Sequence, residues 1–412
     1  MLKTNQNQNV EIAKAKKQTV WNHSNFIILL VSGAVIAFGS KIYELALPLI
    51  LYQFTNSPVV MSTMRGIEFL PNLLLAMFIG VLVDRARKKV WSLWTLLFQI
   101  IILLILYFSI QSGQHSPLLF YNCGFLLMTF NYAFFNARMS IVKQALPTEL
   151  LTSANASFNF ISTFIGIMGP ALTGLILMLS SLHFGLLLTA LSFVFAFIIL
   201  CLLTTEESTS YPIKGGFWRE LKEGWIELYH NQTLLLISIA VIFLNSTAGM
   251  VDTTIVFYSK DVLKLSNSEL GILLSSTGLG GLIGSLVVGK VRKIWSTGVI
   301  TTVTTLLIGF TYLIIFLSSS YYLMALALFL EGIFSTICNV CIWTFRQEST
   351  PQHLIGRISG ITGSVFKLSM PFAIFGAGWI SELADPSKVF MIAFIGNCLI
   401  FIFCRFSLLW KK

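Results

Sequence analysis

The stretch Gly80–Trp91, GVLVDRARKKVW, decides how this chain folds. It closes a long apolar run, and it sets one carboxylate, Asp84, directly before the four cations Arg85, Arg87, Lys88 and Lys89. The stretch returns 204 residues later as Gly284–Trp295, GSLVVGKVRKIW, with five identical residues. A second region obeys the same offset, which maps Pro147 onto Pro351. The sequence therefore predicts two homologous halves.

Composition places the chain in a lipid membrane. Hydrophobic residues make up 56% of the 412 residues, charged residues make up only 11%, and the mean hydropathy is +0.82. A water-soluble domain carries about a quarter charged residues, so lipid is the predicted solvent of this surface. The net charge of +10 does not indicate a nucleic-acid partner, because the cations cluster at the ends of apolar segments.

Twelve segments are long and apolar enough to cross a bilayer, which takes about 20 residues. Their even number puts both termini on one side of the membrane. The first segment is too long for the core of a signal peptide, so no cleaved signal is expected. The predicted spans are 26–54, 59–83, 90–110, 117–138, 152–180, 183–204, 231–258, 266–290, 297–317, 321–345, 354–381 and 388–409.

These spans predict four regions: a tail over 1–25, a six-helix bundle over 26–204, a linker over 205–230, and a second six-helix bundle with a short tail over 231–412. Within the linker, FWRELKEGWIELY (Phe217–Tyr229) has an apolar stripe at helical spacing and charges on the rest of its surface. We expect this helix to lie at the membrane surface. A regulatory or partner-binding helix is the alternative.

The distribution of cations predicts the orientation. Of the 27 Lys and Arg residues, 21 fall in the tails and in the loops on the side of the termini, a count that places Arg138 and Arg346 in loops. Only Lys260, Lys264 and Lys388 fall in the opposite loops. Cytoplasmic loops of membrane proteins carry the excess of Lys and Arg. Both termini and the linker are therefore predicted to be cytoplasmic.

Twelve spans, two halves and a basic turn after the second and eighth spans resemble the major facilitator superfamily over nearly the whole chain. The family pattern G-x-L-x-D-R-x-x-(R/K)-(R/K) is matched by Gly80, Leu82, Asp84, Arg85, Lys88 and Lys89. Arg87 stands where a glycine is more usual, and Val288 replaces the acid in the second copy. The resemblance implies an all-α membrane protein of twelve transmembrane helices in two six-helix pseudo-symmetric bundles.

Further stretches resemble the macrolide-efflux branch of the drug:proton antiporters in that superfamily. They are Phe69–Lys89, Leu146–Ala156, Arg219–Trp225 and Gly356–Pro371. Siderophore exporters of the same branch are similar in these places, so both kinds of substrate stay open. We expect a multi-pass protein of the bacterial inner membrane that acts as a monomer, uses the proton gradient and needs no cofactor.

The resemblance also implies gating residues. In the superfamily the motif acid helps to lock the two halves together on the cytoplasmic side when the transporter opens outward. The motif residues expected to take part are Gly80, Asp84, Arg85, Lys88 and Lys89, although fixing topology is the simpler role for the two lysines. Gly169 and Pro170 resemble the Gly-Pro motif of antiporters, since proline bends a helix and glycine admits a neighbour. Ordinary close packing is the alternative for this pair.

Seven charged residues lie deep inside predicted spans, where each costs at least about 2.5 kcal/mol at the centre of a helix. Lys41 and Glu44 are three residues apart, as are Arg65 and Glu68, so each pair shares a helix face and could neutralise itself. Internal ion pairs are therefore the alternative to a functional role for these four. The other three are Asp252, Glu331 and Lys367.

Glu331 has no such neighbour and is the first candidate for a proton-coupling site. The first, fourth, seventh and tenth helices line the central cavity in the superfamily, which would place Glu331, Glu44 and Asp252 there. Burial favours the protonated form of a carboxylate, so these groups could take up a proton outside and release it inside. Glu68 is a further candidate. The cations that could contact an anionic substrate are Lys41, Arg65 and Lys367.

The sequence predicts a proton-coupled exporter of amphipathic small molecules, macrolide-like drugs first. An exporter of a siderophore or another anionic metabolite is the alternative with the same fold, and a non-transporting membrane sensor is the alternative of another class. Neither an enzyme nor a metal site is expected, because no His, Cys or Ser group has catalytic or metal-binding spacing. Cys338 and Cys341 form an isolated CxxC inside a span, where we interpret them as small packing residues.

Overall fold

The computed structural model describes residues 19–411 except 76–77, 80–81, 84–85, 115, 148–149, 180–181, 205–224, 227, 350–361 and 363. Over these residues the chain is helical and contains no strand. Most of the predicted amphipathic segment lies outside the described residues, as do Gly80, Asp84 and Arg85.

The first half of the chain forms one helical bundle. Its apolar core contains side chains from Val20 to Leu203. The helices are α2 (Ser24–Thr55), α3 (Pro58–Leu74), α5 (Lys88–Gln111), α6 (Pro117–Ala145), α7 (Leu151–Leu179) and α8 (Leu182–Cys201), preceded by the 3-10 turn η1 (Val20–Asn22).

The second half forms another bundle, whose core contains side chains from Leu228 to Leu409 together with Leu49 and Met61 of the first half. Its α13 begins and ends 204 residues after α6, at 321 and 349 against 117 and 145. The helices are α10 (Gln232–Asp261), α11 (Asn267–Val291), α12 (Thr297–Leu317), α13 (Tyr321–Ser349), α15 (Met370–Leu383) and α16 (Ser387–Phe406), followed by the 3-10 turn η4 (Leu408–Lys411).

Local signals account for several helix ends. Ser266 and Glu269 form a capping box that starts α11, because each side chain bonds the backbone N–H of the other. Pro58 and Pro117 occupy the first turn of α3 and α6, where a missing N–H costs nothing. Asn56 ends α2 in the left-handed conformation, with φ of 48°.

Nine of the described helices are long and apolar enough to cross a membrane. Parts of the predicted spans 59–83, 152–180 and 354–381 fall outside the described residues. The count of twelve spans therefore stays a prediction, while the all-α architecture of two bundles is observed.

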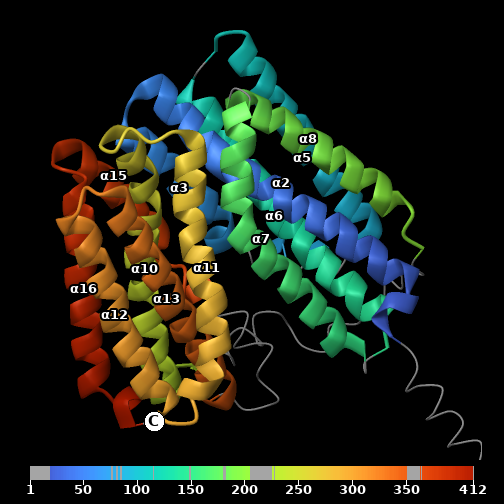
Figure 1. The fold of residues 1–412 in the computed structure, drawn as a ribbon. Coiled ribbons are helices and arrows are strands. Elements are labelled where there is room, and N and C mark those ends of the chain that lie inside the picture. Colours follow the sequence, from blue (N-terminus) through green and yellow to red (C-terminus); the bar gives the residue numbers. More distant parts are fainter. Residues whose placement is uncertain are drawn as a thin grey trace, which may run out of the picture.

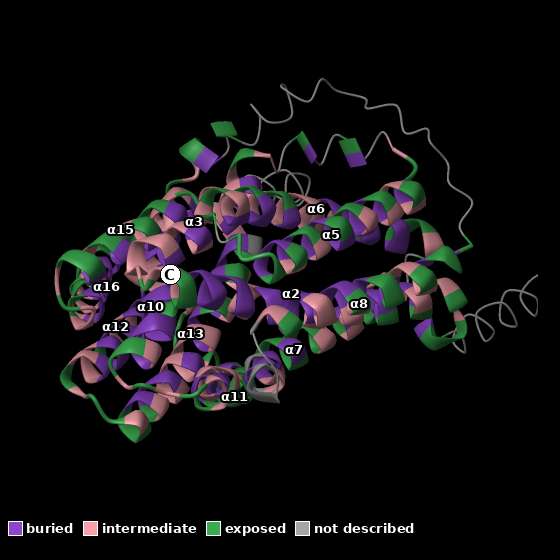
Figure 2. Ribbon diagram, turned by 90° about the horizontal axis from the view of Figure 1, so that it is seen from above, coloured by how far each residue is buried: buried purple, intermediate pink, exposed green. Residues whose placement is uncertain are grey.

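The two bundles join at the end of the molecule away from the chain termini and diverge towards the termini (Figure 1). There α3 packs against α15 and α7 against α11. Seen from above, the same two pairs lie side by side, and buried residues line the helix sides that face the inside of each bundle (Figure 2). At Gly174 on α7, a Cβ would come 2.8 Å from the Gly271 Cα on α11, so only glycine allows this approach.

The span predicted over 354–381 is not one continuous helix. The helix is interrupted by a turn at Phe366–Ser369, and α15 begins at Met370. Within the turn, three N–H groups donate to carbonyls three residues back and not four: those of Lys367, Leu368 and Met370. Pro371 explains the interruption, because it has no N–H for the carbonyl four residues back and its ring would clash with that carbonyl.

Candidate functional site

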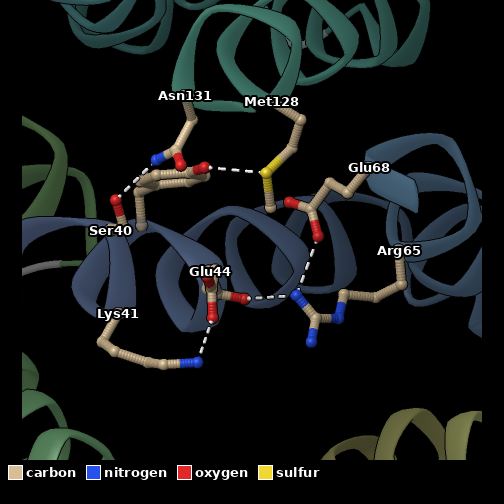
Figure 3. Close-up of polar contacts among 8 residues, drawn as sticks. Ser40, Lys41, Glu44, Arg65, Glu68, Met128 and Asn131 are labelled. Atoms are coloured by element: carbon tan, nitrogen blue, oxygen red, sulfur yellow. Dashed lines mark hydrogen bonds and ion pairs between the residues drawn. The ribbon is translucent and has the colours of Figure 1, made fainter. Parts of the chain in front are cut away.

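Both predicted ion pairs of the first half are formed, on neighbouring helices. Lys41 Nζ lies 2.6 Å from Glu44 Oε2 on α2, and Arg65 Nη1 lies 2.7 Å from Glu68 Oε2 on α3. Arg65 also donates to the Glu44 carbonyl oxygen at 3.2 Å, which links the two helices. Figure 3 shows the four side chains with their polar neighbours Ser40, Met128 and Asn131.

The two pairs differ in exposure. The Glu68 side chain is fully buried, and its Oε1 has no hydrogen-bond partner among the described residues. The Lys41 side chain is 38% exposed, and its stem packs on α7, where a Cβ at Gly169 would lie 3.2 Å from Lys41 Cγ. Gly169 therefore makes room for a charged neighbour on α2. The side chain of Pro170 lies outside the described residues, and α7 continues through it.

Asp252 on α10 connects these charges to the second half. Its side chain is exposed to solvent although it lies well inside α10. It interacts electrostatically with Arg65 and Lys41 across the boundary between the bundles. It also interacts with Glu331 on α13, which brings all four predicted carboxylates into one electrostatic network.

Glu331 differs from the other three carboxylates, because no described cation interacts with it. Ser335, one turn along α13, lines the same cavity, and Asp252 is the charge that acts on the Glu331 carboxylate. The side chain is half-buried and lines a cavity of about 50 Å³ between α10, α12, α13 and α16. The other polar residues that line this cavity are Asn245, Tyr312, Ser335, Asn339 and Asn397.

Lys367 lies in the turn before α15, and no described carboxylate comes within ion-pair distance of it. The turn is held by α10: Asn245 Nδ2 donates to the Phe366 carbonyl at 2.7 Å, and Ser369 Oγ donates to the Ile242 carbonyl at 3.0 Å. Non-helical backbone at membrane depth requires such partners, because lipid cannot hydrogen-bond it. The sequence predicted that Lys367 lies near the middle of a helix, but the structure places it in a turn that α10 supports.

The two lysines of the repeated motif sit at the start of α5. Lys89 Nζ donates to the Cys201 and Leu203 carbonyls, at 3.0 and 2.7 Å, and so caps the C-terminal end of α8. A cation is favourable there because it meets the negative end of the helix dipole. Lys88 is buried. The contacts of Lys89 join α5 and α8 within one bundle. This role is structural and is separate from the gating role that the motif led us to expect.

Sequence reasoning missed a contact between the bundles at their far end. Glu382, at the end of α15, accepts hydrogen bonds from Ser57 Oγ at 2.6 Å and from the Val59 N–H at 3.3 Å. These groups form the N-terminus of α3, whose dipole favours a negative charge. The partners are 325 and 323 residues apart, so no local pattern could have revealed them.

Arg138 and Arg346 lie inside helices, which corrects the count that placed them in loops, because α6 and α13 run past them. The Arg138 guanidinium lies 4.8 Å from the ring centre of Phe135 and 4.6 Å from that of Phe158, and Arg346 lies 3.8 Å from Trp343. Each stacks on an aromatic residue three positions earlier. An arginine three positions after an aromatic residue, in the corresponding helix of each half, is the sequence signal that could have identified both arginines as helix residues.

Two helical bundles join at one end with charged side chains between them, and nine of the described helices are long and apolar enough to cross a membrane. This is the architecture of a membrane protein. No group of three or more His, Cys, Asp or Glu side chains among the described residues could hold a metal ion. Cys338 and Cys341 are buried, as packing residues would be.

The chain belongs to the Major Facilitator Superfamily, whose sequence profile matches residues 29–374. Macrolide efflux protein A of Streptococcus pyogenes is 22% identical over 393 residues, which cover 92% of this chain and 93% of that protein. The multidrug efflux pump Tap of Mycolicibacterium fortuitum is 23% identical over 377 residues, covering 89% and 91%. These relatives are exporters, as the sequence predicted.

Solved structures show the same fold. A bacterial homologue of the iron transporter ferroportin, in an inward-facing state, has a TM-score of 0.73 at 16% identity, covering 94% of this chain and 98% of that one.

Proposed function

We propose that this protein exports amphipathic small molecules, macrolide-like drugs first, across the bacterial inner membrane in exchange for protons. The observation that carries the proposal is Glu331. It is a carboxylate inside the membrane-spanning part of the second half, with no described counter-charge, beside a polar cavity. The likeness to a macrolide efflux protein and a multidrug efflux pump supports the substrate class.

Alternating access would use the two ends of the molecule in turn. Contacts between α3 and α15 and between α7 and α11 close the end away from the termini. If both termini are cytoplasmic, this arrangement is the inward-facing state. Glu331 would release its proton to the cytoplasm in this state. Asp252, whose charge acts on Glu331, would transmit the change in charge that substrate binding brings. Glu331 would take up a proton again when the opposite end opens. We expect a monomer to suffice.

Export from a pump-deficient bacterial host tests the proposal. Cells that express the chain are loaded with a macrolide, a cationic dye or a set of siderophores, with and without a protonophore. Macrolide or dye efflux that stops with the protonophore is the expected result. Efflux that the protonophore leaves unchanged, from protein shown to be in the membrane, contradicts proton coupling.

One observation favours a second substrate class. Lys367 has no described carboxylate partner and sits in a turn where a helix is interrupted. Broken helices form substrate sites in other transporter folds, and an anionic group would neutralise this cation. Efflux of a siderophore alone in the same assay supports this alternative, and a Lys367→Gln variant should then lose it.

A further inference from the structure

The cavity beside Glu331 is lined by one carboxylate and several uncharged polar side chains whose oxygens can accept hydrogen bonds or bind a cation. Asn397 is fully buried, and its Nδ2 donates to the Ala393 carbonyl at 3.0 Å and to Thr247 Oγ1 at 3.4 Å. Its Oδ1 has no partner among the described residues. An unpaired buried amide oxygen costs about 1–3 kcal/mol, so a donor or a cation near Asn397 would stabilise this site.

A second amide is arranged in the same way. Asn245 also lines the cavity, and its Nδ2 is engaged with the Phe366 carbonyl at 2.7 Å. Its oxygen is therefore the part of the amide left for the cavity. The Glu331 carboxylate, the Ser335 and Tyr312 hydroxyls and the amides of Asn245, Asn339 and Asn397 line one space, and no described Lys, Arg or His lines it.

We propose that this cavity is a binding site for a sodium ion. Hard cations are bound by carboxylate, amide and hydroxyl oxygens, which are the groups collected here. The charge of the site favours a monovalent ion, because one carboxylate neutralises one positive charge, and excess charge inside a membrane is costly. The cavity, about 50 Å³, is large enough for a small ion with one or two water molecules.

The sodium site and the proposed proton coupling share one residue, Glu331, and the sodium proposal rests on the proposed function only at that residue. Sodium would occupy the site when Glu331 has lost its proton, so both cations use one carboxylate. The charged and titratable groups that face Glu331 are Asp252 on α10, Tyr312 on α12 and Cys338 on α13. None of them is a cation that could replace sodium.

Thermal unfolding of the purified full-length protein in detergent tests the site without any transport assay. The midpoint is measured against increasing NaCl, KCl, choline chloride or methylammonium chloride at constant ionic strength. We expect sodium alone to raise the midpoint, in proportion to the logarithm of its concentration. Glu331→Gln and Asn397→Leu should weaken the apparent sodium affinity at least tenfold, whereas the control Asp261→Asn, exposed at the end of α10, should keep it.

Several results would overturn the proposal. Equal responses to sodium and potassium mean that no sodium site exists, and an equal response to methylammonium makes the site one for organic ammonium groups. A sodium response that survives in Glu331→Gln, or is lost in Asp261→Asn, places the site elsewhere. Should a cavity variant fail to fold, equilibrium binding of radioactive sodium to the wild-type protein decides. The outcome is independent of efflux, which is assayed in sodium-free buffer.

Discussion

At the scale of single residues, the charges inside the bundles divide into two kinds. Lys41, Glu44, Arg65 and Glu68 form ion pairs within one turn of a helix, so their net charge is zero and the internal-pair interpretation holds for their geometry. Glu331 has no described cation beside it. A proton is the simplest way to neutralise such a carboxylate in a membrane, which makes Glu331 the residue most suited to coupling.

Replacing Glu331 by Gln should abolish uphill export and leave the protein folded in the membrane. Glutamine keeps the shape of a protonated glutamate, but it cannot release a proton. We expect substrate to equilibrate in both directions at a rate that a protonophore no longer changes. The measurement is substrate accumulation in inverted vesicles with an imposed pH gradient. Accumulation at the wild-type level would remove Glu331 as the coupling site.

Replacing Arg65 by Ala should destabilise the protein by on the order of 3 kcal/mol, because it strands the fully buried Glu68 without its partner. The double variant Arg65→Met, Glu68→Leu should recover most of this loss, since it removes both charges. Chemical denaturation of purified protein measures both. A double variant as unstable as Arg65→Ala would show that the pair itself, and not the stranded charge, supplies the stability.

At the scale of elements, the turn before α15 is the main departure from regular structure among the described spans. Pro371 interrupts the helix, and Asn245 and Ser369 satisfy backbone groups around the turn. By contrast, Pro48 lies inside α2 without breaking it. The difference shows that a proline alone does not interrupt a helix. An interruption inside a membrane also needs neighbouring groups that hydrogen-bond the freed backbone.

Replacing Pro371 by Ala should reduce the transport rate several-fold. Alanine restores an N–H for the Lys367 carbonyl, which favours a continuous helix and moves Lys367 and the groups held by α10. Initial rates of efflux at equal expression measure the effect. Pro48→Ala is the matched control, and it should change the rate less. Equal rates for Pro371→Ala and wild type would mean that the turn has no part in transport.

The sequence allowed much of the fold to be predicted, because membrane helices follow from apolar length alone. The two i, i+3 pairs were also predictable, since a helix fixes which residues share a face. Contacts between distant segments were not predictable. Nothing local places Glu382 on Ser57, or Asn245 and Asn397 beside Glu331, because such contacts depend on how the bundles pack.

At the scale of the whole molecule, one end of the interface between the bundles is closed in this structure. Glu382 bonds the N-terminus of α3 at that end. The superfamily motif suggests that Asp84, outside the described residues, serves the opposite end. The two acids would then stabilise opposite states of one equilibrium.

Spin labels at positions 143 and 290 would report that equilibrium in a variant without native cysteines. Both positions lie near the end of their helix, α6 or α11, on the side of the molecule where the chain termini lie. Glu382→Gln should raise the population with a short distance, and Asp84→Asn should raise the population with a long one. A helix-terminus charge is worth about 0.3–1 kcal/mol, a two- to fivefold change in the ratio of states. A shift in the same direction for both variants would contradict the idea that Glu382 and Asp84 stabilise opposite states.

In the proposed mechanism, drug leaves the cell in exchange for protons carried by Glu331. Purified protein in liposomes with a trapped pH-sensitive dye provides the sharpest test, with macrolide added in sodium-free buffer and no pre-set gradient. We expect proton movement that starts on addition of substrate, opposes the direction of drug flux, and is lost in Glu331→Gln. Drug flux through the wild-type protein without any proton movement would contradict it.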